Sequence, residues 1–432
     1  MESKRHLTED FHKITRLERL SRLQELCDLN PQDISVLSGE KTLPYEMAEH
    51  MIENVIGYFQ MPLGLATHFV IDGRDVLIPM AVEETSIIAA ASATAKWIRR
   101  EGSIRTYTKG SLIIGQVQLP HVRDVHHARR VLHEKRDEMM EISNRLVAGL
   151  VHRGGGVQDI AVREIQRPYG DGVMMVLHVL CDPCDAMGAN LINQVCEALK
   201  PKIEEWTREK VGLCILSNLV DTKLAVAEVI IRNVDPVIGK GIEEATLFAM
   251  ADPYRAATHN KGVLNGIDPV LIATGNDWRA AEAGIHAYAA RSGAYRPITN
   301  WRLEGTDLVG NIELPLAVGT AGGVTKIHPT AKTALKILGV QHAHELARIC
   351  AAVGLVQNLG ALKALVTVGI VKGHMQLHAA NLAIAAGAEV HEIPRVREQL
   401  AEVLRVEKNI NLTRAKEILE AIRVNQRPSV HF

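Results

Sequence analysis

The sequence of 432 residues is poor in aromatic side chains and has almost no net charge. Phe, Trp and Tyr together make up 4% of the residues, which argues against a surface on which nucleic-acid bases stack. The 49 basic and 50 acidic residues leave a formal charge of −1, so no overall field favours nucleic acid or an anionic membrane. The length is sufficient for more than one globular domain with a substantial core.

Long apolar runs are also missing. The N-terminal stretch "MESKRHLTEDFHKITRLERL" carries charges throughout and lacks the apolar region of a signal peptide. No apolar run reaches the roughly 18 uninterrupted residues of a membrane-spanning helix. The longest candidates, 86–95 and 353–371, are short or are interrupted by Gln357, Asn358 and Lys363. We therefore expect a cytoplasmic protein that does not bind a membrane.

Cysteines are few, and only one pair has the spacing of metal ligands. That pair is Cys181 and Cys184, in "CDPC". A structural zinc site usually requires a second pair of this kind, and the sequence has none. We expect the six cysteines to be reduced thiols of a cytosolic protein, with no metal site.

The periodicity predicts an α+β fold in which a small α+β unit is inserted into a mainly helical domain. Leucines at helical spacing in "TRLERLSRLQELCDL" and small residues at 85–100 predict helices in the first hundred residues, the second with Thr85 or Ser86 as N-cap. "SLIIGQVQLP", "VMMVLHVLCD" and "VGLCILSNL" are typical of strands. A long amphipathic helix over 122–151 and a second helix entered through Gly188 separate them. No "GxGxxG" follows a strand, so a Rossmann unit is not expected.

Four short stretches hold groups suited to catalysis: "PMAVEETSIIAAAS" with Glu83 and Glu84, "DPYRAATHNKG" with Arg255 and Lys261, "GNDWRAAEAG" with Asp277, and "KGHMQLHAAN" with His374 and His378. Each also has a structural explanation. Acidic residues before a helix stabilise its N-terminus by about 0.3–1 kcal/mol, and Asp277 can close a turn with Gly275 and Asn276. Lys261, between an imidazole and two glycines, lies either in a turn or in a site that uses its charge.

In this order, the stretches resemble the 3-hydroxy-3-methylglutaryl-coenzyme A (HMG-CoA) reductases, in particular the bacterial class that lacks a membrane anchor. "MIENVIGYFQMPLGLA" is similar to their coenzyme A segment, and "DAMGANLIN" is similar to their dinucleotide signature. "DPYRAATHNKGVLNGIDPVLIATGNDWRA" is similar to their catalytic core. "PLAVGTAGGVTKIHP" and "GHMQLHAANLA" complete a series that spans most of the chain.

The resemblance implies reduction of HMG-CoA to mevalonate and coenzyme A by two hydride transfers from NADPH or NADH, through mevaldyl-CoA and mevaldehyde. Lys261 would stabilise the negative charge that develops on the carbonyl oxygen. Asp277 would keep this lysine charged and oriented, and Glu84 would supply a proton to the aldehyde oxygen. His374 would protonate the thiolate of the departing coenzyme A.

The resemblance also implies the binding residues. Arg255 would hold the terminal carboxylate of the substrate in bidentate fashion. Further substrate contacts are assigned to Glu53, Asn54, Ser86 and Asn265, and dinucleotide contacts to Asp185, Met187, Gly188, Asn190 and Asn218. At Val147, members of the family that prefer NADH carry an acidic residue that would repel a 2′-phosphate. The valine therefore predicts that NADPH is accepted and preferred, unless Val147 only packs beneath its helix.

The architecture implied by the resemblance has four segments. A large domain for the acyl-coenzyme A comprises 1–108 and 218–368, and 109–217 form a small, ferredoxin-like dinucleotide domain. A helical C-terminal flap with His374 comprises 369–432, with a hinge expected at "GAEVHEIPR". The family also implies a homodimer, or a higher assembly of dimers, with active sites shared between subunits.

Two other functions fit parts of the sequence. A lyase could use Lys261 as a Schiff-base amine, but such a lysine is usually activated by a desolvating pocket or by another cation. A non-catalytic module could bind acyl-coenzyme A or a nucleotide, although binding alone requires neither Glu84 nor His374. Trapping with borohydride would indicate the first, and binding without oxidation of a nicotinamide cofactor the second. The direction of the reaction, biosynthetic or catabolic, stays open.

Overall fold

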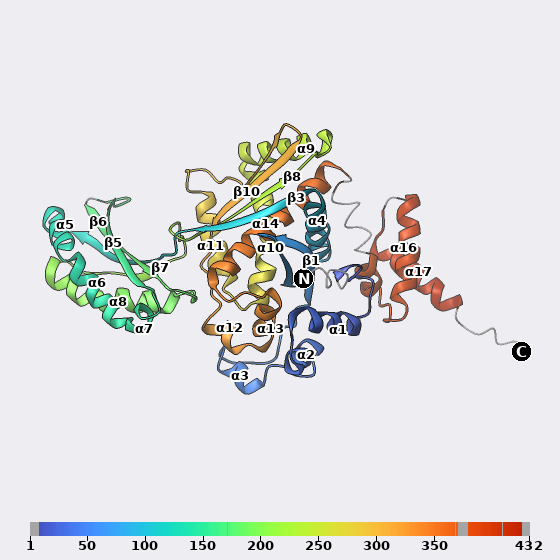
Figure 1. Ribbon diagram of the computed structural model, residues 1–432, viewed down its shortest axis with the longest axis horizontal. Helices are drawn as coiled ribbons and strands as arrows, with labels where there is room; N and C mark the ends of the chain where they lie inside the picture. The colour runs from blue at the N-terminus through green and yellow to red at the C-terminus, as the bar shows by residue number, and fades with distance from the viewer. Residues whose placement is uncertain (1–7, 171, 368, 370–378, 408, 426–432) are drawn as a thin grey trace, which may run out of the picture.

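The computed structural model describes residues 8–170, 172–367, 369, 379–407 and 409–425 (Figure 1). Figure 1 shows a central body, a lobe built on Ile113–Ser217 to its left, and a helical C-terminal unit to its right. Each of the three has a hydrophobic cluster of its own. The α+β class predicted from the sequence is confirmed.

The central body is built around a sheet of six strands in the order β2-β1-β3-β8-β10-β9. Neighbouring strands are antiparallel, except that β1 and β3 are parallel. The strands are β1 (Leu63–Ile71), β2 (Arg74–Ala81), β3 (Gly102–Lys109), β8 (Leu224–Ile231), β9 (Thr299–Glu304) and β10 (Asp307–Pro315). The prediction that the first hundred residues contain only helices and turns was wrong for 63–81, because β2 is apolar along most of its length and shows no alternation.

Helices surround this sheet. They are α1 (Arg16–Cys27), α2 (Pro31–Ser38), α3 (Tyr45–Glu49), α4 (Ile87–Glu101), α9 (Pro236–Ala251), α10 (Pro253–Ala273), α11 (Trp278–Ala289), α12 (Gly323–Ile327), α13 (Pro329–Leu338) and α14 (Ala343–Val366). The predicted helix at "TRLERLSRLQELCDL" is α1, which Thr15 caps through a capping box with Glu18.

Helix α14 lies in the middle of the body, against β3, β8 and β10 and against α4, α9 and α10. Within the described residues it is the one helix long and apolar enough to cross a membrane. However, 67% of its apolar window is buried inside the molecule, together with the polar side chains of Gln357 and Asn358. This is the position of a core helix.

Lys261 lies in the middle of α10, a helix of 21 residues, and not in a turn. Of the two neighbouring glycines, Gly266 serves helix packing, whereas a Cβ atom on Gly262 would meet nothing within 4 Å. A Cβ atom on Gly266 would lie 2.8 Å from the carbonyl oxygen of Val353 on α14. Without a side chain there, α10 and α14 approach each other closely. The faces of α10 are therefore fixed with respect to the core.

The lobe has the connectivity βαββαβ and the strand order β5-β6-β4-β7, with all neighbours antiparallel. This is the ferredoxin-like arrangement. Its strands are β4 (Ile113–Val122), β5 (Gly156–Gln166), β6 (Val173–Asp182) and β7 (Cys214–Ser217). Its helices are α5 (Val125–Glu134), α6 (Arg136–Leu146), α7 (Ala148–Val151) and α8 (Ala189–Thr207). The single helix predicted over 122–151 is interrupted at Lys135 and Val147, and the edge strand β5 was not predicted.

The C-terminal unit contains a helical stretch at 379–385 and the helices α16 (Ile393–Glu407) and α17 (Leu412–Asn425). The sequence predicts one or two amphipathic helices in the last forty residues, and the structure has two. Glu392, within the expected hinge "GAEVHEIPR", is buried and accepts two hydrogen bonds of 2.8 Å from Arg423 on α17. These bonds, with one from the N–H of Glu389, hold the pKa of Glu392 down at about 2.

Candidate active site

Lys261 and Glu84 form an ion pair between two elements that lie far apart in the sequence. The Nζ atom of Lys261 lies 3.3 Å from Oε2 of Glu84, which precedes α4. The lysine side chain is 61% exposed and the glutamate 42%. The site therefore faces solvent, and both groups remain accessible to a ligand. The partner of Lys261 is thus an acid, whereas a Schiff-base lysine is usually activated by a desolvating pocket or by another cation.

Ser86 follows Glu84 closely and has an unusual backbone. Its φ is +77°, in the left-handed region that a residue with a side chain rarely adopts. It occupies the N-cap position of α4 as predicted, but its side chain does not cap the helix. Strain of this kind gathers at functional sites. The loop thus places Glu84, Ser86 and the N-terminus of α4 at the same edge of the body.

Asp277 is the N-cap of α11. Its Oδ1 atom accepts hydrogen bonds from the N–H of Ala280 at 3.1 Å and from Nε of Arg279 at 3.2 Å. The carboxylate thus has a structural role as the N-cap of α11, whereas the alternative considered from the sequence was a turn with Gly275 and Asn276. Among the described contacts its ion pair is with Arg279, whereas that of Lys261 is with Glu84. A contact between Asp277 and Lys261 stays a prediction.

Arg255 and Asn265 lie on α10, on either side of Lys261 along the chain. Arg255 is half-buried, and no hydrogen bond or ion pair of its side chain occurs within the described residues. Burial lowers the pKa of Arg255 from its ordinary value, because the charged form has lost water without gaining an acid. Asn265 is one turn beyond Lys261, so the two side chains share a face of the helix. A desolvated guanidinium of this kind suits a carboxylate ligand.

A buried polar network beneath Lys261 was not recognised in the sequence. Nε2 of His259 lies 2.5 Å from Oγ1 of Thr299 on β9 and 3.2 Å from Nδ2 of Asn358 on α14. The indole N–H of Trp301 donates to the same asparagine. Burial, and to a lesser extent the charge of Arg255, lowers the pKa of His259 to about 4. The network holds α10 against β9 and α14, so Lys261 projects outward from a fixed helix.

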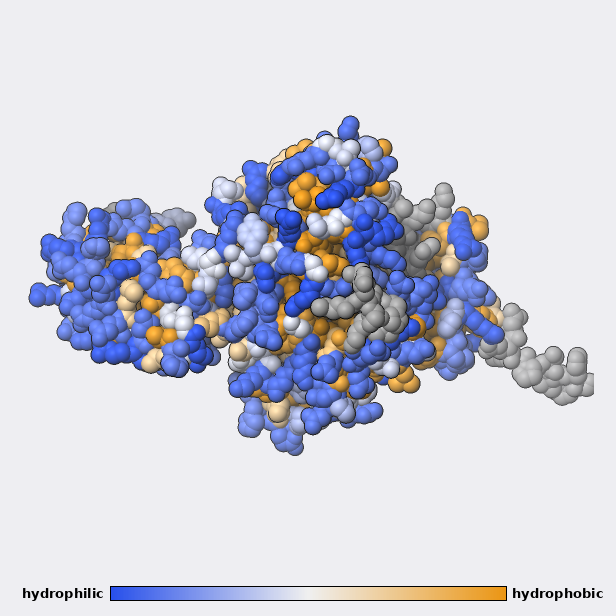
Figure 2. Space-filling view, in the orientation of Figure 1, coloured by the Kyte–Doolittle hydropathy of each residue, from blue (hydrophilic) through white to orange (hydrophobic). Residues whose placement is uncertain are grey.

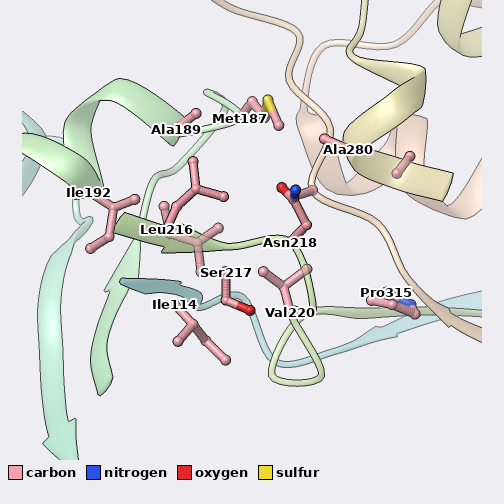
Figure 3. Close-up of a pocket in the computed structure, with 13 residues that line it drawn as sticks. Ile114, Met187, Ala189, Ile192, Leu216, Ser217, Asn218, Val220, Ala280 and Pro315 are labelled. Atoms are coloured by element: carbon pink, nitrogen blue, oxygen red, sulfur yellow. The ribbon is translucent and has the colours of Figure 1, made fainter. Parts of the chain in front are cut away.

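A pocket lies between the lobe and the central body (Figure 3). Met187 lines it from the lobe and Asn218 from the residue directly after β7, and both are predicted to bind the dinucleotide. Ala280 and Ala281, in the first turn of α11 after Asp277, line it from the body. In Figure 3 the side chain of Asn218 points toward the α11 side. A ligand in this pocket would therefore lie next to the helix that Asp277 caps.

Gly188 begins α8 and has a φ of +91°. A Cβ atom there would meet Cδ1 of Ile113 at 2.5 Å and Cβ of Pro183 at 2.8 Å, so only glycine fits. No side chain caps this end of the 19-residue helix. Its first N–H groups can bind a phosphate, as predicted for this stretch. Asn190, in the same turn, is exposed.

Asp185 is occupied by contacts within the protein. Its carboxylate accepts a hydrogen bond of 2.9 Å from the N–H of Ala343 and lies 3.1 Å from Nδ1 of His342, at the N-terminus of α14. Burial alone would raise the pKa of Asp185, but these two partners outweigh it and lower the pKa. The residue joins the lobe to the core helix of the body. A direct contact with a dinucleotide stays a prediction, and would require these partners to be exchanged.

A sequence profile described as hydroxymethylglutaryl-coenzyme A reductase matches residues 15–379. The chain belongs to the HMG-CoA reductase family. It is 47% identical to the 3-hydroxy-3-methylglutaryl-coenzyme A reductase of Archaeoglobus fulgidus over 419 residues, which cover 96% of this chain and 94% of that protein.

Two solved structures of the enzyme from Streptococcus pneumoniae support the same assignment at 38% identity. One covers 96% of this chain and 99% of that protein with a TM-score of 0.81. The other, described as the class II HMG-CoA reductase bound to NADPH in open conformations, covers 83% and 99% with a TM-score of 0.80. The fold seen here is thus that of class II HMG-CoA reductases.

Some residues assigned by resemblance to HMG-CoA reductases lie apart from Lys261 in the described structure, and one lies outside the described residues. Glu53 and Asn54 lie in an exposed segment of irregular structure, and no contact joins them to Lys261 or Arg255 in the described structure. His374, like His378, lies outside the described residues. Val147 is 7% exposed and belongs to the hydrophobic core of the lobe, which is the packing role considered as the alternative for this position.

Proposed function

We propose that the chain reduces HMG-CoA to mevalonate and coenzyme A at the site formed by α10, the start of α4 and the start of α11, using two molecules of NADPH or NADH. The pairing of Lys261 with Glu84 carries this proposal, because it sets an ammonium group and a carboxyl group side by side at the accessible edge of the body. The nicotinamide cofactor, when bound, supplies hydride. The test is oxidation of the cofactor followed at 340 nm with HMG-CoA as substrate. A purified protein that binds HMG-CoA without oxidising either cofactor would contradict it.

Lys261 stabilises the oxygen that gains negative charge in both reductive steps. A positioned donor is most effective where water is excluded, so substrate and cofactor must cover the side chain, which is exposed here. Glu84 gives a proton to the aldehyde oxygen, and its contact with Lys261 places the two groups at the same atom. Asp277, from the neighbouring helix, keeps the lysine oriented.

Arg255 binds the terminal carboxylate of the substrate. Its guanidinium is half-buried and without an acidic partner among the described residues, so a carboxylate restores the interactions that burial removed. Ser86 and Asn265 contribute hydrogen bonds to the same moiety from α4 and α10. Glu53 and Asn54 contact the substrate from their exposed segment.

His374 protonates the thiolate of coenzyme A. The two half-reactions separate this role from the others. His374→Gln should reduce activity severely with HMG-CoA, where a thiolate leaves, and should largely spare the reduction of added mevaldehyde. Equal losses of activity in both reactions would show that His374 does not protonate the thiolate.

The dinucleotide binds at the lobe, with its phosphates at the N-terminus of α8 and Met187 and Asn218 in contact with it. The fit is supported by the uncapped start of α8 at Gly188 and by the pocket that both residues line. NADPH is the preferred cofactor: Val147 packs in the core of the lobe, and the position thus provides no acidic side chain that would repel a 2′-phosphate. The Streptococcus pneumoniae relative bound to NADPH supports this choice.

The chain acts as a homodimer. The segment 52–60 exposes Ile52, Ile56, Tyr58 and Phe59, and α9 exposes Val237, Leu247 and Phe248. Figure 2 shows hydrophobic surface near α9. A second copy would cover these side chains and bring Glu53 and Asn54 to a neighbouring site.

Light scattering should give twice the mass of the chain, and Phe59→Ser should lower both the mass and the activity. A fully active monomer would contradict the dimer. The location of the protein in the cytoplasm stays a prediction.

A further inference from the structure

A second pocket, of about 200 Å³, lies between the hairpin of β1 and β2, the strand β3 and the first turns of α14. Charged and apolar side chains line it together: Asp72, Arg74, Glu345 and Arg348, and Ile71, Val76, Thr106 and Ile349. A buried cavity of about 150 Å³ is large enough to hold a benzene molecule. The pocket therefore has room for a small organic ligand.

This pocket is separate from the site around Lys261. Arg348 precedes Asn358 on α14 by ten residues, which is about 15 Å along the helix. Asn358 belongs to the buried network beneath Lys261. In addition, β2 begins at the pocket with Arg74, whereas Glu84 follows the opposite end of this strand. A ligand in the pocket would thus not contact the reacting groups.

The guanidinium of Arg348 has hydrogen-bond donors to spare. Its side chain is 29% exposed, its Nε atom is buried, and none of its N–H groups forms a hydrogen bond within the described residues. The acid beside it is Asp72, whose Oδ2 atom lies 3.7 Å from Nη1, which is too far for a hydrogen bond. Both oxygens of Asp72 already accept bonds from Thr106, at 2.7 Å from its N–H and at 2.5 Å from its hydroxyl. An acceptor supplied by a ligand would offset the cost of these unused donors.

The other two charged groups show the same imbalance. Oε2 of Glu345 accepts hydrogen bonds from the N–H groups of Gln341 at 2.8 Å and His342 at 3.1 Å. Arg74 is exposed, and its one hydrogen bond among the described residues is to the carbonyl oxygen of Gly339 at 3.3 Å. The acids of the pocket are thus supplied with donors by the protein, whereas both guanidinium groups can bind a further acceptor. The pocket suits an anion and not a cation.

We propose that this pocket is a binding site for a small organic carboxylate with a short apolar chain. Arg348 and Arg74 donate to the carboxylate, for which the guanidinium fork has the matching geometry. The chain packs against Ile71, Val76 and Ile349, which belong to the core of the body and are each less than 5% exposed. The inference does not depend on the proposed function, because none of these residues takes part in it.

The pocket also borders the contact between the body and the lobe. Glu345 caps the first turn of α14 through the N–H of His342, and the next residue, Ala343, donates its N–H to Asp185 of the lobe. A carboxylate in the pocket therefore lies against the turn that holds the lobe.

Titration with butyrate, followed by ligand-observed NMR, tests the proposal. The titration uses the variant Arg255→Gln, in which the guanidinium proposed to bind the substrate carboxylate is absent. Butyrate should bind to this variant and reach saturation. Acetate should bind about tenfold more weakly, because burial of each additional CH₂ group tightens binding by about fourfold. Butylamine, which has the same chain length and the opposite charge, should not bind. Lack of saturable butyrate binding, or tighter binding of inorganic phosphate than of butyrate, would overturn the proposal.

Further substitutions in the Arg255→Gln chain locate the binding. Arg348→Gln should weaken butyrate binding by about ten- to a hundred-fold, since hydrogen bonds to a charged group are lost. Arg74→Gln, at an exposed position where the fold is not affected, should weaken it several-fold. Arg130→Gln removes an exposed positive charge from α5 and should leave the affinity unchanged. Melting temperatures without butyrate show that each variant is folded. If neither Arg348→Gln nor Arg74→Gln weakens binding, the pocket is not the site.

Discussion

The Nζ atom of Lys261 lies 3.3 Å from Oε2 of Glu84, a residue 177 positions earlier in the sequence. Both side chains are substantially exposed, so the pair contributes little to the stability of the fold, about 0–1 kcal/mol. The pair is important because of its position in the candidate active site. Once substrate and cofactor exclude water, the same charges interact several times more strongly.

Lys261→Ala should lower the rate of both reductive steps by about a hundred- to a thousand-fold, because both develop charge on the same oxygen. Its melting temperature should stay close to that of the wild type, since the side chain is exposed. Steady-state assays with HMG-CoA and with mevaldehyde measure the two steps. Lys332→Ala, which removes another exposed lysine from α13, is the matched control. Near-normal turnover in Lys261→Ala would show that the charge of Lys261 is not used.

Arg255→Lys should raise KM for HMG-CoA more than it lowers kcat. Lysine keeps the charge but cannot form the two parallel hydrogen bonds that a guanidinium makes with a carboxylate, and kcat/KM should fall about ten- to a hundred-fold. The control is Arg232→Lys, at an exposed position after β8. If the two variants have the same kcat/KM, Arg255 does not bind the carboxylate.

Val147→Asp should shift the ratio of kcat/KM values toward NADH. The substitution also places a charge at a position that is only 7% exposed, so the melting temperature should drop. Leu146→Asp, next to it and 42% exposed, should change neither property. If the wild-type enzyme rejects NADPH, or if the aspartate leaves the ratio of kcat/KM values unchanged, Val147 does not determine which cofactor is preferred.

His259 should make the protein less stable in mild acid. Burial lowers the pKa of His259 to about 4, below the value of about 6.5 in the unfolded chain. The unfolded chain therefore binds the proton first, and stability decreases as pH falls from about 6.5 to about 4, by about 3 kcal/mol. Denaturant titrations at pH 7 and pH 4.5 measure this change. His259→Gln should be less stable at pH 7 and show a smaller loss on acidification. An equal loss in wild type and variant would exclude His259 as its source.

Sequence reasoning succeeded where a local pattern decides the structure. The strand over 173–182 and the helix entered through Gly188 are found as β6 and α8, because a short apolar run and a glycine at a helix start act within a few residues. Sequence reasoning failed where contacts between distant segments determine the structure. The strands of the central sheet come from both sides of the lobe in sequence, and β5 is an edge strand with many exposed residues. The glycines after Lys261 suggested a turn, whereas contact with α14 explains Gly266 within a helix.

In the candidate site, too, local motifs identified individual residues but did not show the contacts between distant segments. Motifs identified Lys261 and Glu84 without showing that they touch, and the ion pair depends on how α10 meets the loop before α4. His259 and Asn358 were not recognised, because their network joins three elements that no local spacing relates. Asp185 was assigned to the cofactor from its motif, yet its partners are His342 and Ala343.

Because Asp185 is hydrogen-bonded to the first residue of α14, the length of that helix affects how the lobe is placed relative to the body. From Ala343 to Val366 the helix measures about 36 Å, and eight residues after Val366 the sequence reaches His374. One residue added to α14 would advance one end by about 1.5 Å and rotate it by about 100° relative to the other. The anchor at Asp185 and the end of α14 at Val366 would then lose their common alignment. The helix thus fixes the distance between its contact with the lobe and its other end, and changes of single residues in its length should be far less tolerated than changes in its composition.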